Sequence, residues 1–276
     1  KAAKTAASKA PKKVAKKTAK VKKTSAPPKK APVKKAKLPG KAAKTAAKVA
    51  TKQATKAPRR RSKALIEKWH NQGRLGYAIT PRFAITSTPA QLEMTGALAA
   101  EHPDCYIQTH LSENHDEIAF TATLYPDARD YLDVYEGYGL LGPRTLLGHA
   151  IHLKDREIGA IAGNGAHPVF CPTSNLFLGS GLFDDAGLRA RGIQNGIATD
   201  IGAGTSYSML QTLNEGYKIL QLQDQKLHTL RAFHWITRGN AVALGLEDKV
   251  GTLAVGSEAD VVVLNAAATP AMQLRM

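Results

Sequence analysis

The stretch TLLGHAIHLKDREIGAIAGNGAHPVFC, residues 145–171, decides the fold class of this 276-residue chain. It opens with the apolar run Thr145–Ile151, continues with a helical pattern over Lys154–Asn164 and closes with a second apolar run, His167–Cys171. Two strands that are joined by a helix of this length lie parallel, because a tight turn joins only antiparallel strands. The stretch therefore predicts one β-α-β unit of a parallel sheet.

The same alternation extends in both directions along the chain. Further strands are expected at Leu75–Thr80, Cys105–Thr109 and Ile193–Thr199. Helical patterns are expected at Pro89–Glu101, Asp116–Tyr138, Gly181–Gly192, Ser206–Gln223 and Leu230–Leu244. Alternating strands and helices predict an α/β fold with a parallel sheet. Val250–Asn265 instead predicts a hairpin that belongs to a separate small β unit.

The basic residues are concentrated in the first 61 positions. This segment holds 23 of the 39 Lys and Arg residues and no acid, whereas the rest holds all 22 acids and only 16 basic residues. The net charge of +17 therefore combines a strongly basic segment with a mildly acidic body. Segment 1–61 also lacks Phe, Trp and Tyr, so it cannot bury enough apolar surface to offset the entropy of ordering. We expect it to be a disordered tail.

A solvated polycation of this kind can bind nucleic acid. Lysines that neutralise phosphates release counterions, so the binding is independent of base sequence and weakens steeply with salt. The composition resembles that of linker-histone tails and of Lys/Ala/Pro-rich histone-like bacterial proteins. A histone-like nucleic-acid-binding protein is therefore one hypothesis for the chain, and it would place the protein in a nucleoid or a nucleus.

The composition changes abruptly between Arg61 and Ser62. Ser62 is expected to cap a short amphipathic helix over Lys63–Asn71, with which the acidic body begins. The sequence thus predicts three units, namely a basic tail, a partial barrel and a remnant of a small β domain, over residues 1–61, 62–245 and 246–276.

Several classes of protein are excluded or disfavoured. No run approaches the roughly 18 apolar residues that cross a bilayer, and the first 61 residues lack the apolar core of a secretory signal. Because it begins with Lys1, the chain is expected to be processed or a fragment. Cys105 and Cys171 are too few for a disulfide framework, so they are expected to be buried thiols in a reducing compartment. These features favour a cytoplasmic protein without membrane contact.

Side chains that can bind a metal follow three of the predicted strands. His110, with Glu113 three residues later, ends one strand, His149 ends the next, and Asp200 follows the last. Catalytic groups of a (β/α)₈ barrel stand at these strand ends. Imidazole and carboxylate suit zinc, which lowers the pKa of its bound water to about 7. Taken singly, a strand-end His is often only hydrogen-bonded, and an Asp near Gly often forms a turn.

Four segments around these residues resemble the guanine deaminases of the amidohydrolase superfamily. They are Gln108–Asn114, Gly148–Leu153, Cys171–Asn175 and Thr199–Gly204, and flanking runs such as Ile79–Phe83, Tyr131–Tyr135 and Gly256–Asp260 agree. The resemblance extends from about Leu65 to about Pro270. It implies a (β/α)₈ barrel and a zinc-dependent hydrolysis of guanine to xanthine and ammonia.

The resemblance also implies roles for individual residues. His110 and Asp200 would bind zinc, and Glu113 would carry a proton to the ring and then to the leaving amine. His149 would hold the zinc-activated water and the transition state. This water would attack C2 of guanine.

Substrate binding is implied for a second, overlapping set of residues. Arg82 and its neighbour Phe83 would grip the purine, and the planar guanidinium suits a purine carbonyl because its donors are fixed in one plane. The full set implied in substrate binding is Arg82, Phe83, His110 and Asp200.

The sequence departs from this family in one respect. The family opens its barrel with a strand that ends in a His-x-His pair of zinc ligands, and no such pair precedes the barrel here. By correspondence the chain supplies about strands 4–8, and the open sheet edges predict a homo-oligomer. The hypotheses are therefore an active guanine deaminase, a histone-like protein, or an inactive chimeric fusion of a basic tail to a truncated deaminase.

Overall fold

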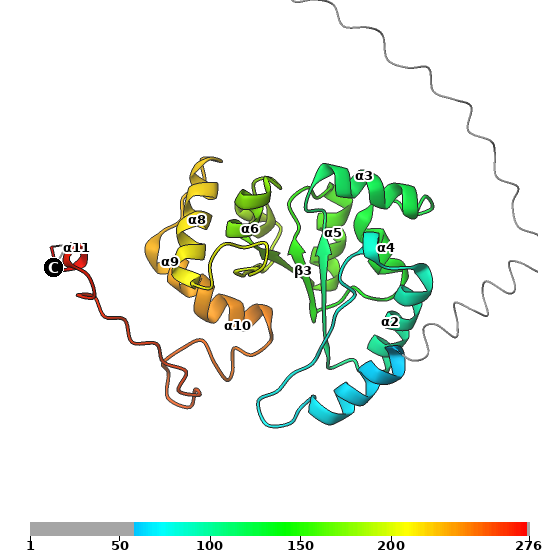
Figure 1. Ribbon diagram of the computed structural model, residues 1–276, viewed down its shortest axis with the longest axis horizontal. Helices are drawn as coiled ribbons and strands as arrows, with labels where there is room; N and C mark the ends of the chain where they lie inside the picture. Colours follow the sequence, from blue (N-terminus) through cyan, green and yellow to red (C-terminus); the bar gives the residue numbers. More distant parts are fainter. Residues whose placement is uncertain (1–57, 275–276) are drawn as a thin grey trace, which may run out of the picture.

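The computed structural model describes residues 58–274, and a parallel β-sheet runs through their centre (Figure 1). Its five strands are hydrogen-bonded in chain order, β1-β2-β3-β4-β5, and every neighbouring pair is parallel. The strands are β1 (Ala78–Ile79), β2 (Tyr106–Leu111), β3 (Thr145–His149), β4 (His167–Phe170) and β5 (Gly196–Ile197). This order confirms the predicted α/β fold with a partial barrel, since adjacent parallel strands in chain order are the arrangement of a (β/α)₈ barrel.

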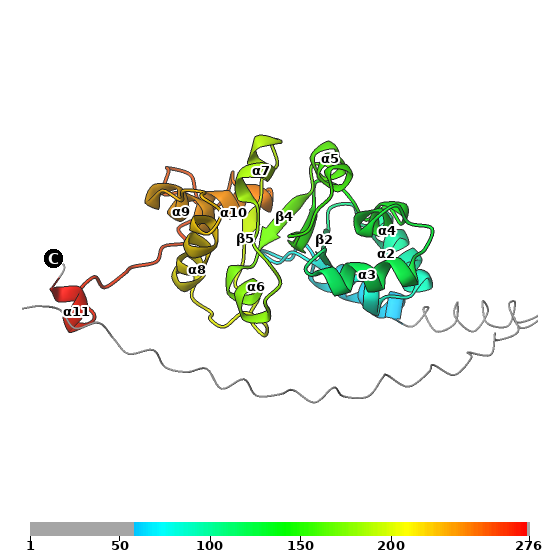
Figure 2. The same cartoon turned by 90° about the horizontal axis from the view of Figure 1, so that it is seen from above.

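Helices connect the strands and follow one another along the sheet. Figure 2 shows α2, α3 and α4 at one end and α8, α9 and α10 at the other. The prediction over Pro89–Glu101 is confirmed by α2, which has these bounds. Its start follows from Thr88, whose side chain accepts a hydrogen bond from the Gln91 N–H, and from Pro89 in the first turn. Helix α5 (Asp155–Asn164) likewise ends at Gly165, which adopts φ +67°.

The single helix predicted over Asp116–Tyr138 is wrong, because two helices occupy this stretch. Helix α3 (His115–Leu124) ends just before Pro126, which has no N–H for a helical hydrogen bond. Helix α4 (Tyr131–Gly137) begins anew at Asp130, whose carboxylate accepts from the Asp133 N–H.

Two shorter helices lie between β4 and β5. Helix α7 (Asp185–Ala190) is all that forms of the helix predicted over Gly181–Gly192. Helix α6 (Pro172–Leu178) was not predicted, because its polar residues Pro172–Asn175 resemble a strand-end loop.

The segment after β5 is helical, as predicted. It contains α8 (Met209–Gln221), α9 (Thr229–His234), the π-helical turn η2 (Trp235–Gly239) and α10 (Asn240–Ala243). The Asn240 side chain forms hydrogen bonds with the backbone of Ile197 at the outer edge of the sheet. Its amide oxygen accepts from the Ile197 N–H and its amide nitrogen donates to the Ile197 carbonyl, both at 2.9 Å. Ile197 therefore makes the two hydrogen bonds that a further strand would offer.

The hairpin predicted over Val250–Asn265 is wrong. The structure places no strand in this segment. Glu258 and Asp260 pair with Arg74 of the body, and the residues beyond them run away to the short helix α11 (Pro270–Gln273) in Figure 1. The segment's apolar side chains are exposed, among them Leu253, Val255, Val262 and Val263. A strand requires a hydrogen-bonded neighbour, and the described part of the chain supplies none here.

The boundary of the basic tail also needs correction. Residues 58–69 are helical, so Arg59–Arg61 belong to a helix, contrary to the prediction that they are disordered, and Ser62 is not an N-cap. This helix is held to the body by buried Ile66 and by ion pairs of Arg59 and Lys63 with Glu101 of α2. The rest of the predicted tail and its nucleic-acid binding concern residues 1–57, outside those that the structure describes.

The core lies on both sides of the sheet and contains both cysteines. Phe170 of β4 stacks on Phe183 at 4.6 Å between ring centroids and on Trp235 at 5.8 Å. Cys105 and Cys171 are buried and unpaired, which confirms their prediction as buried free thiols. Among residues 58–274, no helix is both long enough and apolar enough to cross a membrane.

Candidate active site

Three of the predicted residues converge at the carboxyl ends of the strands. His110 lies on β2, His149 ends β3 and Asp200 follows β5. One ligand atom from each lies within 4.8 Å of the other two, and the two imidazole rings stack at 5.2 Å. The parallel register explains the convergence of the first two, because His110 is paired with Gly148 and its neighbour Leu111 with His149.

The imidazole of His110 is oriented by the segment that follows β1. Its Nδ1 lies 2.6 Å from the carbonyl oxygen of Arg82, which also accepts the His110 backbone N–H. A carbonyl oxygen can only accept, so Nδ1 carries the proton and Nε2 is left with its lone pair. His110 thus presents an unprotonated nitrogen to the cluster.

His149 is buried at the centre of the cluster. Its Nδ1 lies 2.9 Å from Oδ1 of Asn175 in α6. Its Nε2 lies 3.7 Å from a Glu113 carboxylate oxygen and 3.9 Å from one of Asp200. These separations are too long for hydrogen bonds. The imidazole nitrogen and the two carboxylates therefore border a small space without a hydrogen bond from Nε2 to either carboxylate.

Glu113 is held through both its side chain and its backbone. Its Oε1 accepts from the Ser180 hydroxyl at 2.8 Å, which leaves the other carboxylate oxygen facing His149. Its backbone N–H donates to Glu117 at 3.0 Å, and the Glu117 carboxylate is fixed in turn by the Tyr131 hydroxyl at 2.5 Å. The carboxylate of Glu113 therefore has a defined position beside the cluster.

The loop that carries Asp200 closes tightly on itself. Asp200 adopts φ +49°, and its carbonyl accepts from the Gly204 N–H at 2.6 Å. A Cβ at position 204 would lie 1.8 Å from the Thr199 carbonyl oxygen, so only glycine fits. The Thr173 hydroxyl donates to that same carbonyl at 3.0 Å and ties the loop to α6.

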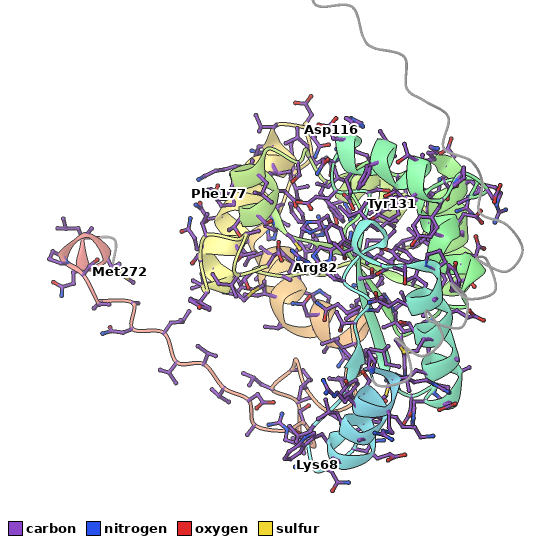
Figure 3. All side chains as sticks on the ribbon, turned by 45° about the vertical axis from the view of Figure 1, so that its right-hand side comes forward. Lys68, Arg82, Asp116, Tyr131, Phe177 and Met272 are labelled. Atoms are coloured by element: carbon purple, nitrogen blue, oxygen red, sulfur yellow. The ribbon has the colours of Figure 1, made fainter. Side chains whose placement is uncertain are left out.

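Arg82, which is labelled in Figure 3, and its neighbour Phe83 lie beside His110. The Arg82 side chain is exposed, and its guanidinium carbon lies 5.1 Å from the centroid of the Phe83 ring. The Phe83 ring is 5.3 Å from that of His110. The structure thus brings together all six residues that the sequence singled out.

Comparison with known proteins agrees with this geometry. The sequence profile of the Amidohydrolase family matches residues 29–274. The chain belongs to the amidohydrolase family. Guanine deaminase of Escherichia coli is 51% identical over 215 residues, which are 78% of this chain and 49% of that protein. This amidohydrolase chain therefore spans about half the length of the relatives that it matches.

Solved structures resemble the same part of this amidohydrolase. E. coli guanine deaminase superimposes with a TM-score of 0.78 at 50% identity, over 79% of this chain and 51% of that one. A guanine deaminase from C. acetobutylicum with guanine in its active site gives 0.66 at 30% identity, over 70% and 48%. An adenosine deaminase from Xanthomonas campestris with bound zinc gives 0.67 at 26% identity, over 72% and 46%. None of these comparisons supports the histone-like hypothesis.

The donor set of this amidohydrolase fits a metal ion. His110 and His149 each have an oxygen atom at Nδ1, and Asp200 adds a carboxylate oxygen to the same space. Metal-binding histidines are typically oriented by an oxygen at their second ring nitrogen. The resemblance implies that His149 holds the water and the transition state. In the structure its ring nitrogen also belongs to the same group of possible ligand atoms as those of His110 and Asp200.

Cys171 borders the cluster, but its sulfur is not one of the three ligand atoms that are grouped there. Burial, together with the nearby Asp200 and Glu113 carboxylates, raises the pKa of its thiol far above the ordinary value. In the metal-free site the thiol is therefore held in its protonated form, which is a poor nucleophile.

Four supporting residues were missed by reasoning from the sequence. Asn175 and Ser180 contact His149 and Glu113, and Glu117 holds the Glu113 backbone. The Tyr135 hydroxyl donates to the His110 carbonyl and accepts from the Ala84 N–H. Glu117 had a local signal, because Asn114 three residues earlier forms a capping box with it. Asn175 and Tyr135 lie in segments that resemble the family, but neither was given a role.

Proposed function

We propose that this chain catalyses the hydrolytic deamination of guanine to xanthine and ammonia. The observation that carries the proposal is the convergence of His110, His149 and Asp200 within 4.8 Å, with the Glu113 carboxylate 3.7 Å from His149. The 51% identity to a guanine deaminase supports guanine, rather than another amino-substituted ring, as the substrate.

Zinc is the metal that we propose for this site. His110, His149 and Asp200 would hold it through two imidazole nitrogens and a carboxylate oxygen, a donor set that zinc accepts. When bound, zinc supplies Lewis acidity, which lowers the pKa of water and polarises the group under attack. The zinc in the similar adenosine deaminase structure supports this assignment.

The side chains around the cluster would bind the purine and move the protons. The exposed Arg82 guanidinium would donate to a purine carbonyl, and the Phe83 ring would lie against the purine. Overall, water adds its oxygen to C2 and the bond from C2 to the exocyclic nitrogen breaks. Glu113 would take one proton from the water and pass it to the ring nitrogen. It would then take the second proton from the hydroxyl on C2 and deliver it to the departing amine, as the C2 carbonyl forms.

The test is the release of ammonia and xanthine from guanine by the purified full chain supplied with zinc. Activity that disappears in Glu113→Gln, while zinc stays bound, is the expected result. Zinc-loaded, folded protein that releases no ammonia from guanine contradicts the proposal.

We propose the cytoplasm as the compartment, since the two buried thiols are free.

We propose separately that the basic segment binds nucleic acid. The observation in its favour is the charge of residues 1–61, with 23 Lys and Arg and no acid. Binding of duplex DNA should weaken steeply with salt and disappear when residues 1–57 are deleted. Binding that is insensitive to salt, or that survives the deletion, contradicts this second proposal.

A further inference from the structure

We propose that Asn175 is a positioning residue that fixes the imidazole of His149 with its proton on Nδ1 and its lone pair on Nε2. The inference rests on the proposed function, because it names the residue that holds one member of the same cluster. It concerns a side chain of α6 that would act only through His149.

The contact between the two side chains is short and excluded from water. Asn175 Oδ1 lies 2.9 Å from His149 Nδ1, and the two residues are 1% and 2% exposed. An amide oxygen can only accept, so the shared proton belongs to Nδ1. The other nitrogen, Nε2, then directs its lone pair toward the space bordered by Glu113 and Asp200.

The backbone of Asn175 is held in place on both sides. Its N–H donates to the Cys171 carbonyl, and its own carbonyl accepts from the Ser180 N–H, both at 2.9 Å. Ser180 is itself anchored, since its hydroxyl donates to Glu113 and its carbonyl lies 2.8 Å from His152 Nε2. These bonds fix the backbone position from which the Asn175 side chain reaches His149, and they connect it to the loop that also holds Glu113.

The backbone of His149 makes this side-chain restraint important. His149 adopts φ +68° and Ala150 φ +49°, a conformation that costs energy in residues other than glycine. The strained turn aims the ring into the cluster, but it does not determine which nitrogen carries the proton. Within the described residues, the contact to Asn175 is the one that Nδ1 makes.

The first test reads the proton position directly and does not depend on activity. We suggest long-range nitrogen–proton NMR of the full, zinc-free chain labelled with ¹⁵N-histidine, recorded over a range of pH values. Signals of His149 are assigned by their loss in His149→Gln. The wild-type ring should carry its proton on Nδ1, and a proton on Nε2 in the wild type overturns the proposal.

The second test compares three substitutions in α6. Asn175→Ala should shift His149 toward a mixture of the two tautomers, whereas Asn175→Asp keeps an acceptor and should restore the Nδ1 proton. Ser174→Ala is the matched control, since Ser174 is fully buried one position away and its hydroxyl has no hydrogen-bond partner in the described structure. An Asn175→Ala protein that melts cooperatively and keeps the wild-type tautomer overturns the proposal.

Zinc affinity is a further measurement that distinguishes the two roles. It should change if Asn175 orients His149, and it should not change if Asn175 only supports the fold. Loss of a group that orients a metal ligand typically costs about 10–100-fold in metal affinity. Asn175→Ala should therefore weaken zinc binding by about this factor, and Asn175→Asp should recover most of it. Equal affinities in Asn175→Ala and Ser174→Ala count against the proposal. If the wild-type chain releases no ammonia from guanine while the tautomer and the zinc affinities are as expected, that result contradicts the proposed function and not this inference.

Discussion

Four of the six non-glycine residues with positive φ in the described part of the chain lie at strand ends around the candidate site. Ser112, His149, Ala150 and Asp200 all adopt φ between +47° and +68°, and each follows or ends a strand of the sheet. Such a conformation persists only where surrounding contacts enforce it. Here those contacts include the hydrogen bonds to Asn175 and Gly204. The strain thus marks the strand ends at which the candidate metal ligands stand.

Asp200 should be required for zinc binding. Asp200→Asn removes a negative charge and replaces a carboxylate with a weaker amide ligand, so we expect zinc affinity to fall by about 10-fold or more. Titration of zinc against a competing chelator measures the effect. Asp224→Asn is the matched control, because Asp224 is an exposed aspartate with a similar φ of +56°. Equal losses in both variants would show that the Asp200 carboxylate is not a ligand.

The Tyr135 hydroxyl should contribute to stability through two buried hydrogen bonds. It donates to the His110 carbonyl at 2.8 Å and accepts from the Ala84 N–H at 2.9 Å. Tyr135→Phe leaves both backbone groups unsatisfied, so the free energy of unfolding should fall by about 1–3 kcal/mol. Urea denaturation measures this loss. Tyr207→Phe, at a side chain that is 83% exposed, should change it by less than about 0.5 kcal/mol.

Elements with local signals could be predicted from the sequence, and elements that depend on distant partners could not. The bounds of α2 follow from Thr88 and Pro89, which act within one turn. His110, Glu113, His149 and Asp200 could be found because each stands at a strand end. Asn175 could not, because its role depends on His149, which lies 26 positions away. The hairpin at Val250–Asn265 failed because β patterning specifies a strand but not its neighbour.

Two helix glycines should respond in opposite ways to the same substitution. In α2, a Cβ on Gly96 would lie 2.1 Å from the Tyr138 carbonyl oxygen, whereas in α5 a Cβ on Gly159 would have no described atom within 4 Å. Gly96→Ala should therefore lower the free energy of unfolding by about 1–3 kcal/mol. Gly159→Ala should raise it by about 0.5–1 kcal/mol, because alanine favours the helix. Thermal and urea unfolding test both, and a stabilised Gly96→Ala would refute the close packing of α2.

The first turn of α4 should contribute a pH-dependent part of the stability. The side-chain hydrogen bond from Arg129 holds the pKa of the Asp133 carboxyl below its ordinary value. A carboxyl whose pKa is lowered by folding stabilises the protein above its unfolded pKa of about 3.9, and this stability is lost as the pH falls toward the folded pKa. Because Arg129 is largely exposed, the contribution should be below about 1 kcal/mol.

Asp133→Asn should remove this contribution and flatten the acid side of the stability curve. Urea unfolding between about pH 3 and pH 7 measures the difference from wild type. Asp127→Asn, at an exposed residue just before the same turn, is the control and should leave the curve unchanged. A parallel shift of the whole Asp133→Asn curve would contradict the role of the ionised carboxylate.

At the scale of the whole molecule, the C-terminal segment should promote self-association. Val262 and Val263 are 83% and 90% exposed, and Leu253 and Val255 are exposed nearby. Adjacent exposed apolar side chains favour association, since burial removes them from water. Sedimentation velocity over a range of concentrations should therefore detect species larger than the monomer.

Charged residues in that segment should reverse the association. Val262→Asp with Val263→Asp should leave a monomer at concentrations where the wild type associates, while Thr252→Asp, in the same segment but at a polar position, should not. A wild-type chain that sediments as a monomer throughout would contradict both this prediction and the homo-oligomer expected from the open sheet.

The side-chain amide of Asn240 protects the outer edge of β5 from other strands. An unpaired strand edge is a template on which foreign strands can grow into fibrils. At Ile197 a side chain already occupies the donor and the acceptor, so an incoming strand must first detach α10. The amide therefore places a kinetic barrier in front of fibril growth at this edge, and its strength is set by how firmly one short helix stays docked.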